Sequence, residues 1–463
     1  MKTLLKFSLI LLLLQAVFAP AAITVTNIAQ GCAANHSLFL KSDGSLWAMG
    51  QNTSGQLGDG TSNWYYNRTN KPEEIVASNV VAIAVGGMHS LFLKSDGSLW
   101  AMGYNGSGQL GDGTLNQTNK PEEIIAGGVT AIAAGDLHSL FLKSDGSLWA
   151  MGCNADGQLG DGTFDNTNQP QEIVASGVTA IAAAGSHSLF LKSNGSLWAM
   201  GYNGYGQLGD GTSNWNTNQP EEIVAGGVTA IAAGGTFVGG DGHSLFLKSD
   251  GSLWAMGQNS SGQLGDGTHN DTNQPEEIVA SGVTAIAAGA HHSLFLKSDG
   301  SLWAMGANYP GQLGDGSLFG TNQPDEIVAS GVTVIAAGYA HSLFLKSDGS
   351  LWGMGRNLEG ELGDGFDDAQ PPNGTVWPEQ IWPRPRPVLA QTVSANTNLQ
   401  FTATCEFGGN FYLLAGTNIT QPLDQWTPVW TNTIRYRWYN IFSATVTNAV
   451  NSGNQQFYIL QSQ

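Results

Sequence analysis

Two kinds of side chain in this sequence have the chemistry that a binding or catalytic site uses: those that recur at a regular spacing and those that occur once. The string HSLFLKS occurs seven times, and each copy is followed by an aspartate within the string GDG. Histidine serves as a general base or metal ligand, and aspartate is a common calcium ligand. The histidines are His36, His89, His138, His187, His243, His292 and His341. Because a unique active site is not built seven times, we predict that these histidines are structural hydrogen-bonding groups and that the aspartates stabilise turns.

Carboxylates that occur in only one copy are the other possible source of catalysis. The candidates are Asp136, Asp156, Glu359 and Glu361. A glycosidase needs two carboxylates about 5 to 10 Å apart. The string SDGSLW resembles the Asp-box hairpin of sialidases but lacks its spacer residues, and a sialidase also needs several arginines to hold the substrate carboxylate. Only Arg68 and Arg356 precede residue 384, and Arg356 with Glu359 or Glu361 is typical of a surface ion pair. We therefore expect no catalytic residues and no cofactor, with a carbohydrate-active hydrolase or lyase as the alternative.

The overall composition excludes several classes of partner. The chain has 463 residues, 36 acidic against 17 basic side chains and a net charge of −19. Such a surface repels nucleic acid and anionic lipid, because both are bound through cations. The three cysteines are far apart in the sequence and form no C-x-x-C pair, so they allow at most one disulfide and predict no metal site.

The first residues have the features of a secretory signal peptide. Lys2 and Lys6 are followed by an apolar run from Phe7 to Phe18 and then by the small residues Ala19-Pro20-Ala21. An uncleaved membrane anchor is the alternative, but the run is short for a hydrocarbon layer of about 30 Å. We expect a signal peptide over residues 1–21, cleavage near Ala21, no stable membrane span afterwards, and a secreted or cell-surface protein.

The repeats predict the elements that position these side chains. Successive HSLFLKS strings begin 53, 49, 49, 56, 49 and 49 residues apart. Each unit contains four strand-like segments, typified by VTAIAAG, HSLFLKS, SLWAMG and PEEIV, with a DG turn between the second and third. Seven units of four antiparallel strands predict an all-β, seven-bladed β-propeller over residues 22–383. First and fourth strands are present in every unit, so the ring needs no borrowed strand, while the sequence leaves open whether blades coincide with repeats.

The motifs IAAG, HSL, GSLWxMG and GQLGDG also carry a family resemblance. Together they resemble the regulator of chromosome condensation repeat family, over residues 23 to 383. The eukaryotic namesake of that family is a nuclear guanine-nucleotide exchange factor that binds chromatin, so the resemblance implies a seven-bladed propeller and, by analogy, an exchange factor. The export signal, the acidity and the lack of a large insertion argue against that activity here. We expect a secreted bacterial member, similar in shape to secreted bacterial propellers that inhibit β-lactamases by presenting loops from one face.

Positions at which the nearly identical copies differ are the best candidates for a binding site. The copies vary between strands one and two and between strands three and four, and antiparallel order places both connections on the same face. Tyrosine, tryptophan and arginine are common in interface hot spots, and aromatic rings also stack on sugars. The predicted binding residues are Trp64, Tyr65, Tyr66, Arg68, Tyr104, Tyr202, Tyr205, Trp215, Tyr309, Tyr339 and Arg356. We expect a monomeric recognition module for an extracellular protein or polysaccharide, and neutral variation of loops is the alternative.

A second unit is expected at the C-terminal end. Residues 384–387 form a proline-rich linker, and residues 388–463 have the alternation of a small β-sandwich-like domain, with strands predicted over 399–405, 411–415, 426–431, 441–447 and 456–460. This segment resembles C-terminal modules on secreted proteins of environmental bacteria, which implies sorting or attachment. Its aromatic residues suit either carbohydrate binding or core packing. They are Trp426, Trp430, Trp438 and Tyr439.

Overall fold

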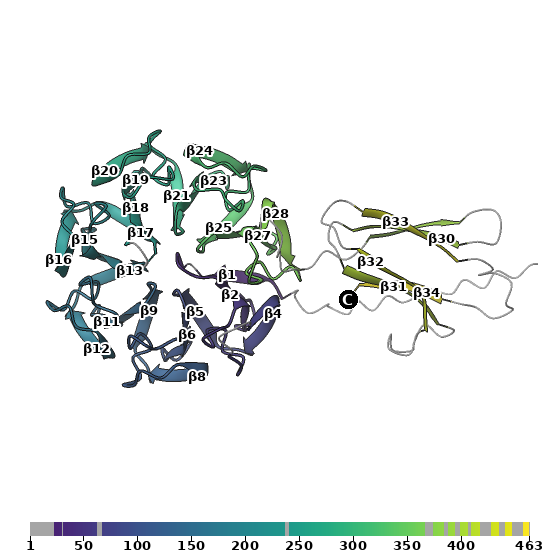
Figure 1. Ribbon diagram of the computed structural model, residues 1–463, viewed down its shortest axis with the longest axis horizontal. Coiled ribbons are helices and arrows are strands. Elements are labelled where there is room, and N and C mark those ends of the chain that lie inside the picture. Colours follow the sequence, from purple (N-terminus) through teal and green to yellow (C-terminus); the bar gives the residue numbers. More distant parts are fainter. Residues whose placement is uncertain are drawn as a thin grey trace, which may run out of the picture.

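The repeat folds into a ring of seven four-stranded sheets in the computed structural model (Figure 1). The structure describes residues 23–29, 31–62, 67–236, 240–365 and 374–383, together with the backbone of six strands between residues 388 and 462. The predicted signal peptide, the predicted linker and three predicted binding residues, Trp64, Tyr65 and Tyr66, lie outside the described residues. Among the described residues every regular element is a strand, which confirms the all-β propeller.

Blades one to four are built from the first sixteen strands. Blade one contains β1 (Val25–Ile28), β2 (His36–Lys41), β3 (Leu46–Gln51) and β4 (Arg68–Val76). Blade two contains β5 (Val80–Val85), β6 (His89–Lys94), β7 (Leu99–Gly103) and β8 (Thr118–Ile125). Blade three contains β9 (Val129–Ala134), β10 (His138–Lys143), β11 (Leu148–Gly152) and β12 (Thr167–Val174). Blade four contains β13 (Val178–Ala184), β14 (His187–Lys192), β15 (Leu197–Tyr202) and β16 (Asn216–Val224).

The remaining three blades follow the same order. Blade five contains β17 (Val228–Gly235), β18 (Gly242–Lys248), β19 (Leu253–Gly257) and β20 (Thr272–Val279). Blade six contains β21 (Val283–Ala288), β22 (His292–Lys297), β23 (Leu302–Gly306) and β24 (Thr321–Val328). Blade seven contains β25 (Val332–Ala337), β26 (His341–Lys346), β27 (Leu351–Arg356) and β28 (Gly374–Trp382).

Strand order within each sheet equals sequence order, so every blade coincides with one sequence repeat. Consecutive strands are antiparallel, as in blade three, where β9 pairs with β10, β10 with β11 and β11 with β12. The first strand of each blade lies nearest the ring axis (Figure 1). Blade seven takes all four strands from the end of the repeat region, so the prediction that the ring needs no borrowed strand is confirmed.

The turn between the second and third strands shows why the aspartate of SDGS recurs. Asp43 Oδ1 accepts hydrogen bonds from the Ser45 backbone N–H (3.0 Å) and hydroxyl (2.6 Å), and the Trp47 indole N–H donates to the same hydroxyl (2.8 Å). These hydrogen bonds favour the ionised carboxylate and lower the pKa of Asp43, the Ser45 hydroxyl contributing most. Gly44 adopts the positive φ of 77° that the turn requires. The aspartate is therefore part of the turn.

Neighbouring blades pack through a repeated apolar cluster. Leu140, Leu142 and Leu148 of blade three bury against Phe190 and Met200 of blade four. The Phe190 ring stacks on Trp198 at 6.0 Å, and Lys192 Nζ lies 3.8 Å above the centre of the Trp198 ring. The tryptophans of the third strands thus pack between blades, and each is half-buried and covered by a lysine.

The segment after residue 387 contains two three-stranded sheets. One contains β29 (Val388–Val393), β30 (Leu399–Cys405) and β33 (Asn440–Val446), and the other contains β31 (Gly409–Gly416), β32 (Thr427–Ile434) and β34 (Phe457–Ser462). All five predicted strands are present within a few residues, and β29 is additional. Packing of the two sheets into a sandwich stays a prediction. No helix in the described part of the chain is long and apolar enough to cross a bilayer.

Candidate functional site

The connections that vary among the repeats emerge on one face of the ring. In each blade the histidine at or next to the start of the second strand pairs with the glycine at or next to the end of the third, as His138 does with Gly152. The connection into the second strand and the connection out of the third therefore lie side by side. A direct contact confirms this, because Gln207 Nε2 in the β15–β16 connection donates to the Gly240 carbonyl in the β17–β18 connection (2.9 Å). We call this surface the variable face.

The repeated histidines lie beneath the variable face and are structural. His138 Nε2 lies 2.9 Å from Ser188 Oγ of the next blade, and the Ser188 hydroxyl donates to the Gln158 carbonyl (2.8 Å). Since that hydroxyl has a single proton, His138 donates from Nε2. Burial lowers the pKa of His138 to about 3, so the ring is neutral. All seven histidines make this bond, which confirms their predicted role.

The aspartates of GDG are also structural. Asp112 Oδ1 accepts from Asn105 Nδ2 (3.0 Å) and from the Thr114 backbone N–H (2.9 Å). The adjacent Gly113 exchanges two hydrogen bonds with Asn168 of the next blade, each 2.9 Å long. These loops thus fasten one blade to its neighbour. In the described part of the chain no group of three or more histidine, cysteine or acidic residues is arranged to hold a metal ion.

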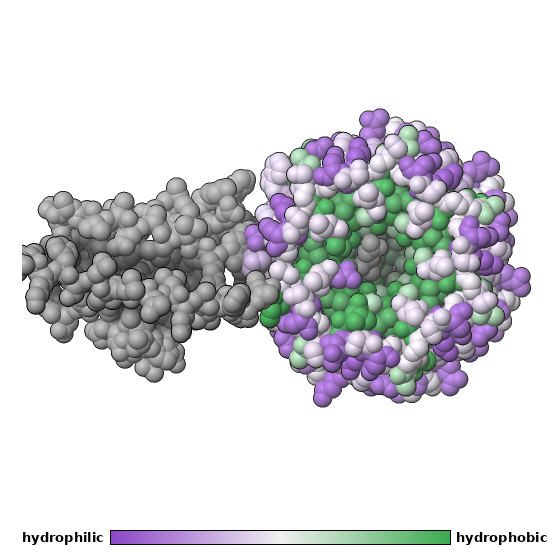
Figure 2. Space-filling model, turned by 180° about the vertical axis from the view of Figure 1, so that it is seen from behind, coloured by the Kyte–Doolittle hydropathy of each residue, from purple (hydrophilic) through white to green (hydrophobic). Residues whose placement is uncertain are grey.

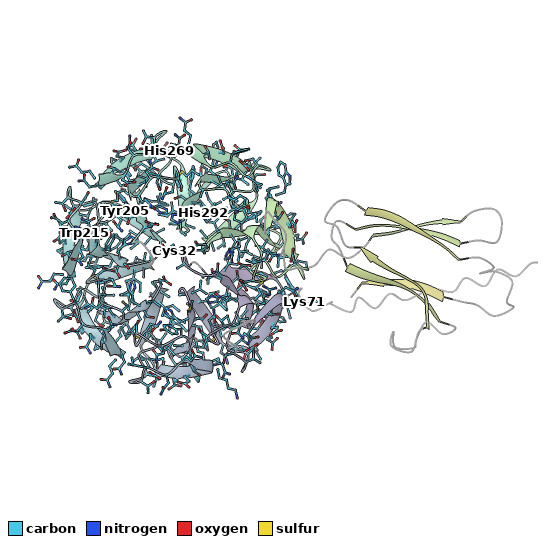
Figure 3. All side chains as sticks on the ribbon, viewed as in Figure 1. Cys32, Lys71, Tyr205, Trp215, His269 and His292 are labelled. Atoms are coloured by element: carbon cyan, nitrogen blue, oxygen red, sulfur yellow. The ribbon has the colours of Figure 1, made fainter. Side chains whose placement is uncertain are left out.

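The predicted aromatic binding residues are distributed around the variable face, and three of them meet. Trp215 is 75% exposed, Tyr309 60% and Tyr339 38%, whereas Tyr104, Tyr202 and Tyr205 are half-buried. The Tyr202 ring lies 6.4 Å from that of Tyr205 and 6.3 Å from that of Trp215, with planes inclined by 49° and 78°. All three belong to the β15–β16 region of blade four. Figure 3 labels Tyr205 and Trp215 in blade four.

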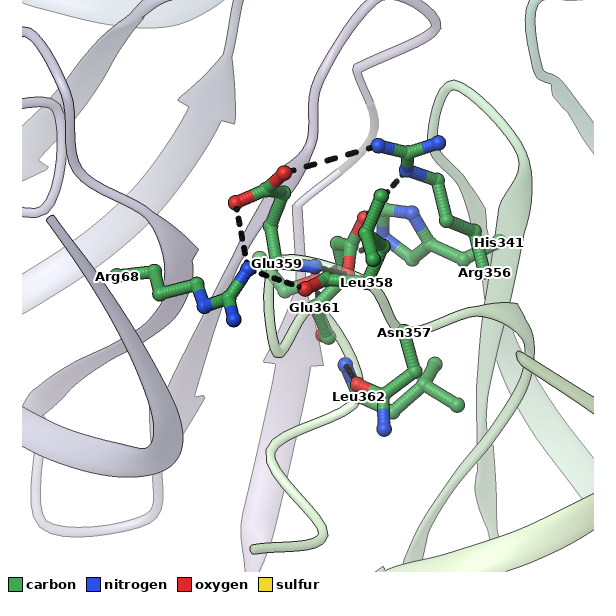
Figure 4. Close-up of polar contacts among 9 residues, drawn as sticks. Arg68, His341, Arg356, Asn357, Leu358, Glu359, Glu361 and Leu362 are labelled. Atoms are coloured by element: carbon green, nitrogen blue, oxygen red, sulfur yellow. Dashed lines mark hydrogen bonds and ion pairs between the residues drawn. The ribbon is translucent and has the colours of Figure 1, made fainter. Parts of the chain in front are cut away.

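The two predicted binding arginines instead join blade seven to blade one. Arg68 Nη1 donates to the Leu358 carbonyl (2.8 Å) and lies 3.5 Å from Glu359 Oε2. Arg356 Nη2 lies 3.8 Å from the other Glu359 oxygen. Figure 4 shows this cluster at the seam of the ring. Both guanidinium groups thus make contacts within the protein, and their binding of a partner stays a prediction.

Arg356 forms the ion pair that the sequence predicts, but one of its partners, Glu361, is buried. Arg356 Nε lies 2.9 Å from Glu361 Oε1, and the Glu361 side chain is fully buried. Six other blades have glutamine here, whose Oε1 accepts a backbone N–H two residues earlier in five of them, as Gln158 does from Asp156 (2.9 Å). Glu361 Oε2 makes the same bond to the Glu359 N–H (2.8 Å), which leaves Oε1 for Arg356. Burial raises the pKa of Glu361 to about 7, against the opposing effect of Arg356.

These contacts bear on the four candidate catalytic carboxylates. Both oxygens of Glu361 are used inside the protein, and Glu359 is held by two arginines. Burial raises the pKa of the half-buried Asp156, and Asp136 lies in blade three, remote in sequence from the seam. The buried Glu361 carboxyl is inaccessible to a substrate, so Glu359 and Glu361 lack the arrangement that glycoside hydrolysis requires.

Sequence reasoning missed a set of exposed apolar residues on the variable face. Leu115 (58% exposed), Phe164 (49%) and Phe319 (82%) follow the GDG motif of their blades, as Trp215 does. We call these four residues the apolar rim. They stand two to four residues after the last glycine of GDG, in the same connection of their blades. Figure 3 shows Trp215 and, in the same connection of blade five, His269 near the outer edge of the ring.

A cavity of about 260 Å³ lies on the ring axis. It is lined by first-strand residues, among them Ile83, Ile132 and Ile181, and by Cys32. Figure 2 shows apolar residues around this central hollow and hydrophilic residues toward the outside. Cys32 and Cys153 are free and buried. Burial raises the pKa of Cys32 to about 12, so it is not a reactive thiolate at neutral pH.

Comparison with known proteins agrees with this architecture. Human WBSCR16 superposes with a TM-score of 0.62 and 25% identity, over 71% of this chain and 88% of that one. Prp20p of Saccharomyces cerevisiae superposes with a TM-score of 0.63 and 23% identity, over 74% of this chain and 87% of that one.

Human Protein RCC2 is 38% identical over 96 residues, which are 20% of this chain and 18% of RCC2. A Caenorhabditis elegans X-linked retinitis pigmentosa GTPase regulator homolog is 44% identical over 82 residues, 18% of this chain and 6% of that protein. The chain thus spans less than a quarter of the length of these curated relatives. Residues 25–56 match the regulator of chromosome condensation (RCC1) repeat and residues 66–404 match the RCC1-like domain, so the chain belongs to the RCC1-like domain family.

Proposed function

We propose that this chain is a secreted or cell-surface recognition module that binds a protein partner through the variable face of its propeller. The observation that carries the proposal is the apolar rim. Four blades present an exposed leucine, phenylalanine or tryptophan two to four residues after the GDG motif, whereas the GDG residues themselves are identical. Single exposed apolar residues are ordinary on protein surfaces, but a set carried by the same connection of several blades is suited to a partner.

The energetics suit an interface anchored by a few residues. Complete burial of a leucine or phenylalanine side chain is worth about 1.5–3 kcal/mol. Leu115, Phe164 and Phe319 are each about half exposed or more, so a partner covering them recovers much of that energy. Aromatic anchors dominate measured interface hot spots. The rim is thus sufficient for a specific protein contact without a catalytic group.

The proposed location rests on the N-terminal sequence. Lys2 and Lys6 with the apolar run from Phe7 to Phe18 support export. Within this proposal the protein is a bacterial, monomeric, non-enzymatic binder, and the C-terminal strands attach or sort it. An extracellular polysaccharide is the competing ligand class.

Regulation of a GTPase is the second candidate, and family membership favours it. One matched relative is named a GTPase regulator homolog, and the Prp20p structure is described together with binding to Gsp1p and histones. Release of a labelled guanine nucleotide from small GTPases, with and without this chain, tests that role. Accelerated release at substoichiometric amounts would replace the recognition proposal.

The decisive experiment compares capture by the wild-type chain, residues 22–463, with capture by the triple variant Leu115→Ala/Phe164→Ala/Phe319→Ala. The matched control is Val81→Ala, an exposed apolar residue outside the rim (54% exposed). Both variants are first checked for unchanged thermal unfolding. We expect a discrete extracellular protein to be retained by the wild type and by the control, and lost with the rim variant. Equal retention by all three chains, or retention of polysaccharide alone, would contradict the proposal.

A further inference from the structure

Blade four presents three aromatic rings whose positions are fixed by the surrounding backbone. Tyr202 lies against Gly204 and Gly240, where an added Cβ would collide with its ring or hydroxyl, so both glycines are needed for its placement. Tyr205 and Trp215 flank Tyr202 with centroids 6.4 and 6.3 Å away. Trp215 is 75% exposed. The three rings therefore form a partly exposed aromatic cluster with differently inclined faces.

Asp241 adjoins this cluster, because it directly follows Gly240, which lies against the Tyr202 ring. Asp241 is the largest cause of the raised pKa of Tyr205, and Asp271 contributes to it. Burial raises the pKa of Tyr202, and the charges of Asp156 and Asp241 add to the effect. These shifts report a negative potential at both phenol groups.

No lysine or arginine of this sector reaches the variable face to neutralise the carboxylates. Between residues 121 and 296 the lysines are Lys143, Lys192 and Lys248, and the sequence has no arginine there. All three end the second strands of their blades, on the opposite side of the ring from the variable face. His291 is near Asp241, and burial lowers the pKa of His291, against the opposing effect of Asp241. The sector therefore combines aromatic faces with negative charge that no lysine or arginine balances.

Other aromatic rings of this protein have a lysine ammonium group over their faces. In every blade a lysine ammonium lies over the tryptophan of the third strand, at distances from 3.4 to 4.2 Å from a ring centre. In blade four this pair is Lys192 and Trp198, 3.8 Å apart. Among the described residues no cation is recorded over Tyr202, Tyr205 or Trp215. The exposed cluster therefore offers aromatic faces, as the seven tryptophans do, but in the described part of the chain it lacks the cation that lies over each of them.

From this geometry we propose that the Tyr202, Tyr205 and Trp215 cluster receives a lysine or arginine side chain of the protein partner, with Asp241 as its counter-ion. The inference rests on the proposed function and specifies the partner's chemistry: a basic segment docking on blade four. A cation over an aromatic face is attracted by the electron-rich face of the ring, and more strongly where water is excluded. The carboxylate adds a charge-assisted attraction that salt weakens. A neutral glycan would gain from stacking on Trp215 but not from Asp241.

The test uses isothermal titration of the mature chain, residues 22–463, with an eight-residue lysine peptide and an eight-residue glutamate peptide at 50 and 500 mM NaCl. We expect the lysine peptide to bind at low salt and the glutamate peptide not to bind. Tyr205→Ala/Trp215→Ala should weaken binding at least tenfold, and Asp241→Asn several-fold. High salt should weaken binding of the wild type more than that of Asp241→Asn.

Matched controls separate this site from general electrostatic attraction. Trp377→Ala removes another exposed tryptophan (56% exposed), in blade seven, and Glu222→Gln removes one exposed negative charge from the outer strand of blade four. Both should bind the lysine peptide as the wild type does. Loss of binding with Glu222→Gln equal to that with Asp241→Asn would overturn the proposal, as would unchanged binding by Tyr205→Ala/Trp215→Ala.

The two proposals fail in different ways. The cluster variant leaves Leu115, Phe164 and Phe319 in place. If a protein is captured through those rim residues and the lysine peptide does not bind, the cationic site is refuted while the recognition function stands. Binding of a neutral oligosaccharide that is lost with Trp215→Ala and unaffected by Asp241→Asn would likewise refute the cationic site.

Discussion

His341 of the last blade and Ser37 of the first lie 3.0 Å apart, Nε2 to Oγ, and this bond completes a hydrogen-bonded circle that passes once through every blade. The same Ser37 hydroxyl donates to the Glu361 carbonyl (2.8 Å). Six equivalent pairs join consecutive repeats. The pair at the seam joins residues 304 positions apart, so it fastens the two ends of the propeller to each other.

Ser37→Ala should destabilise the propeller by about 1–3 kcal/mol, because it leaves a buried imidazole N–H and a carbonyl without partners. Ser188→Ala removes the equivalent bond inside the ring and is the matched comparison. Urea unfolding followed by tryptophan fluorescence measures both. Equal stability of Ser37→Ala and the wild type would show that the ring closes without this bond.

The buried histidines should make the propeller sensitive to acid. Burial lowers the pKa of His36, His138, His243, His292 and His341 to about 3 and that of His89 and His187 to about 4, from an ordinary value of 6.5. The unfolded chain then binds more protons than the folded chain below pH 6.5. The free energy of unfolding should fall as the pH drops through 6.5, by up to about 1.4 kcal/mol per pH unit for each histidine.

Measuring the free energy of unfolding between pH 7.5 and 5 tests this slope. Most carboxylates titrate below that range. His138→Gln should flatten the dependence while lowering stability at pH 7.5, and replacement of the exposed His269 by alanine should leave the slope unchanged. A free energy of unfolding that is constant over this range contradicts the neutral, buried assignment.

Removal of the Arg356 side chain should destabilise the seam by roughly 2 kcal/mol, because it leaves the Glu361 carboxylate buried without its cation. The double variant Arg356→Gln/Glu361→Gln recreates the arrangement of blade five, where Gln263 Nε2 donates to Gln258 Oε1 (3.0 Å). This double variant should recover most of the stability that Arg356→Ala loses. Thermal unfolding of Arg356→Ala, the double variant and the wild type compares the three. A double variant as unstable as Arg356→Ala would refute this explanation of the pair.

Cys32 and Cys153 should resist thiol reagents in the native state. Both are buried, and burial raises the pKa of each thiol. Titration with a chromogenic disulfide, before and after addition of denaturant, measures their reactivity against a Cys32→Ala/Cys153→Ala control. Rapid native reaction that is absent from the control would contradict the burial of these residues.

The repeated features were the most predictable part of the fold. The strands of each blade follow from local patterns, such as the apolar run of HSLFLKS and the turn glycine at Gly44, and seven copies reinforce every assignment. The structural role of the histidines was also predictable, because repetition argued against a unique site. Their serine partners were not, since Ser188 lies 50 residues from His138 and the bond depends on how blades are stacked.

The arrangement of the candidate binding residues could be predicted less well, for two physical reasons. Selecting residues by type favoured Arg68 and Arg356, although the contact of Arg68 with Glu359 spans 291 residues and exists only because the ring closes. The same selection passed over Leu115 and Phe319, which are exposed and follow GDG. The circular arrangement also separates most of the chosen aromatics, and among those that the structure describes, ring contacts join the three of blade four.

The most direct test of the central claim is a footprint of the complex with the captured partner, by hydroxyl-radical labelling of the full mature chain. We predict that Leu115, Phe164 and Phe319 become protected, while exposed residues near the opposite face such as Val81 do not change. Protection confined to the opposite face, or to residues 388–463, would contradict recognition through the variable face.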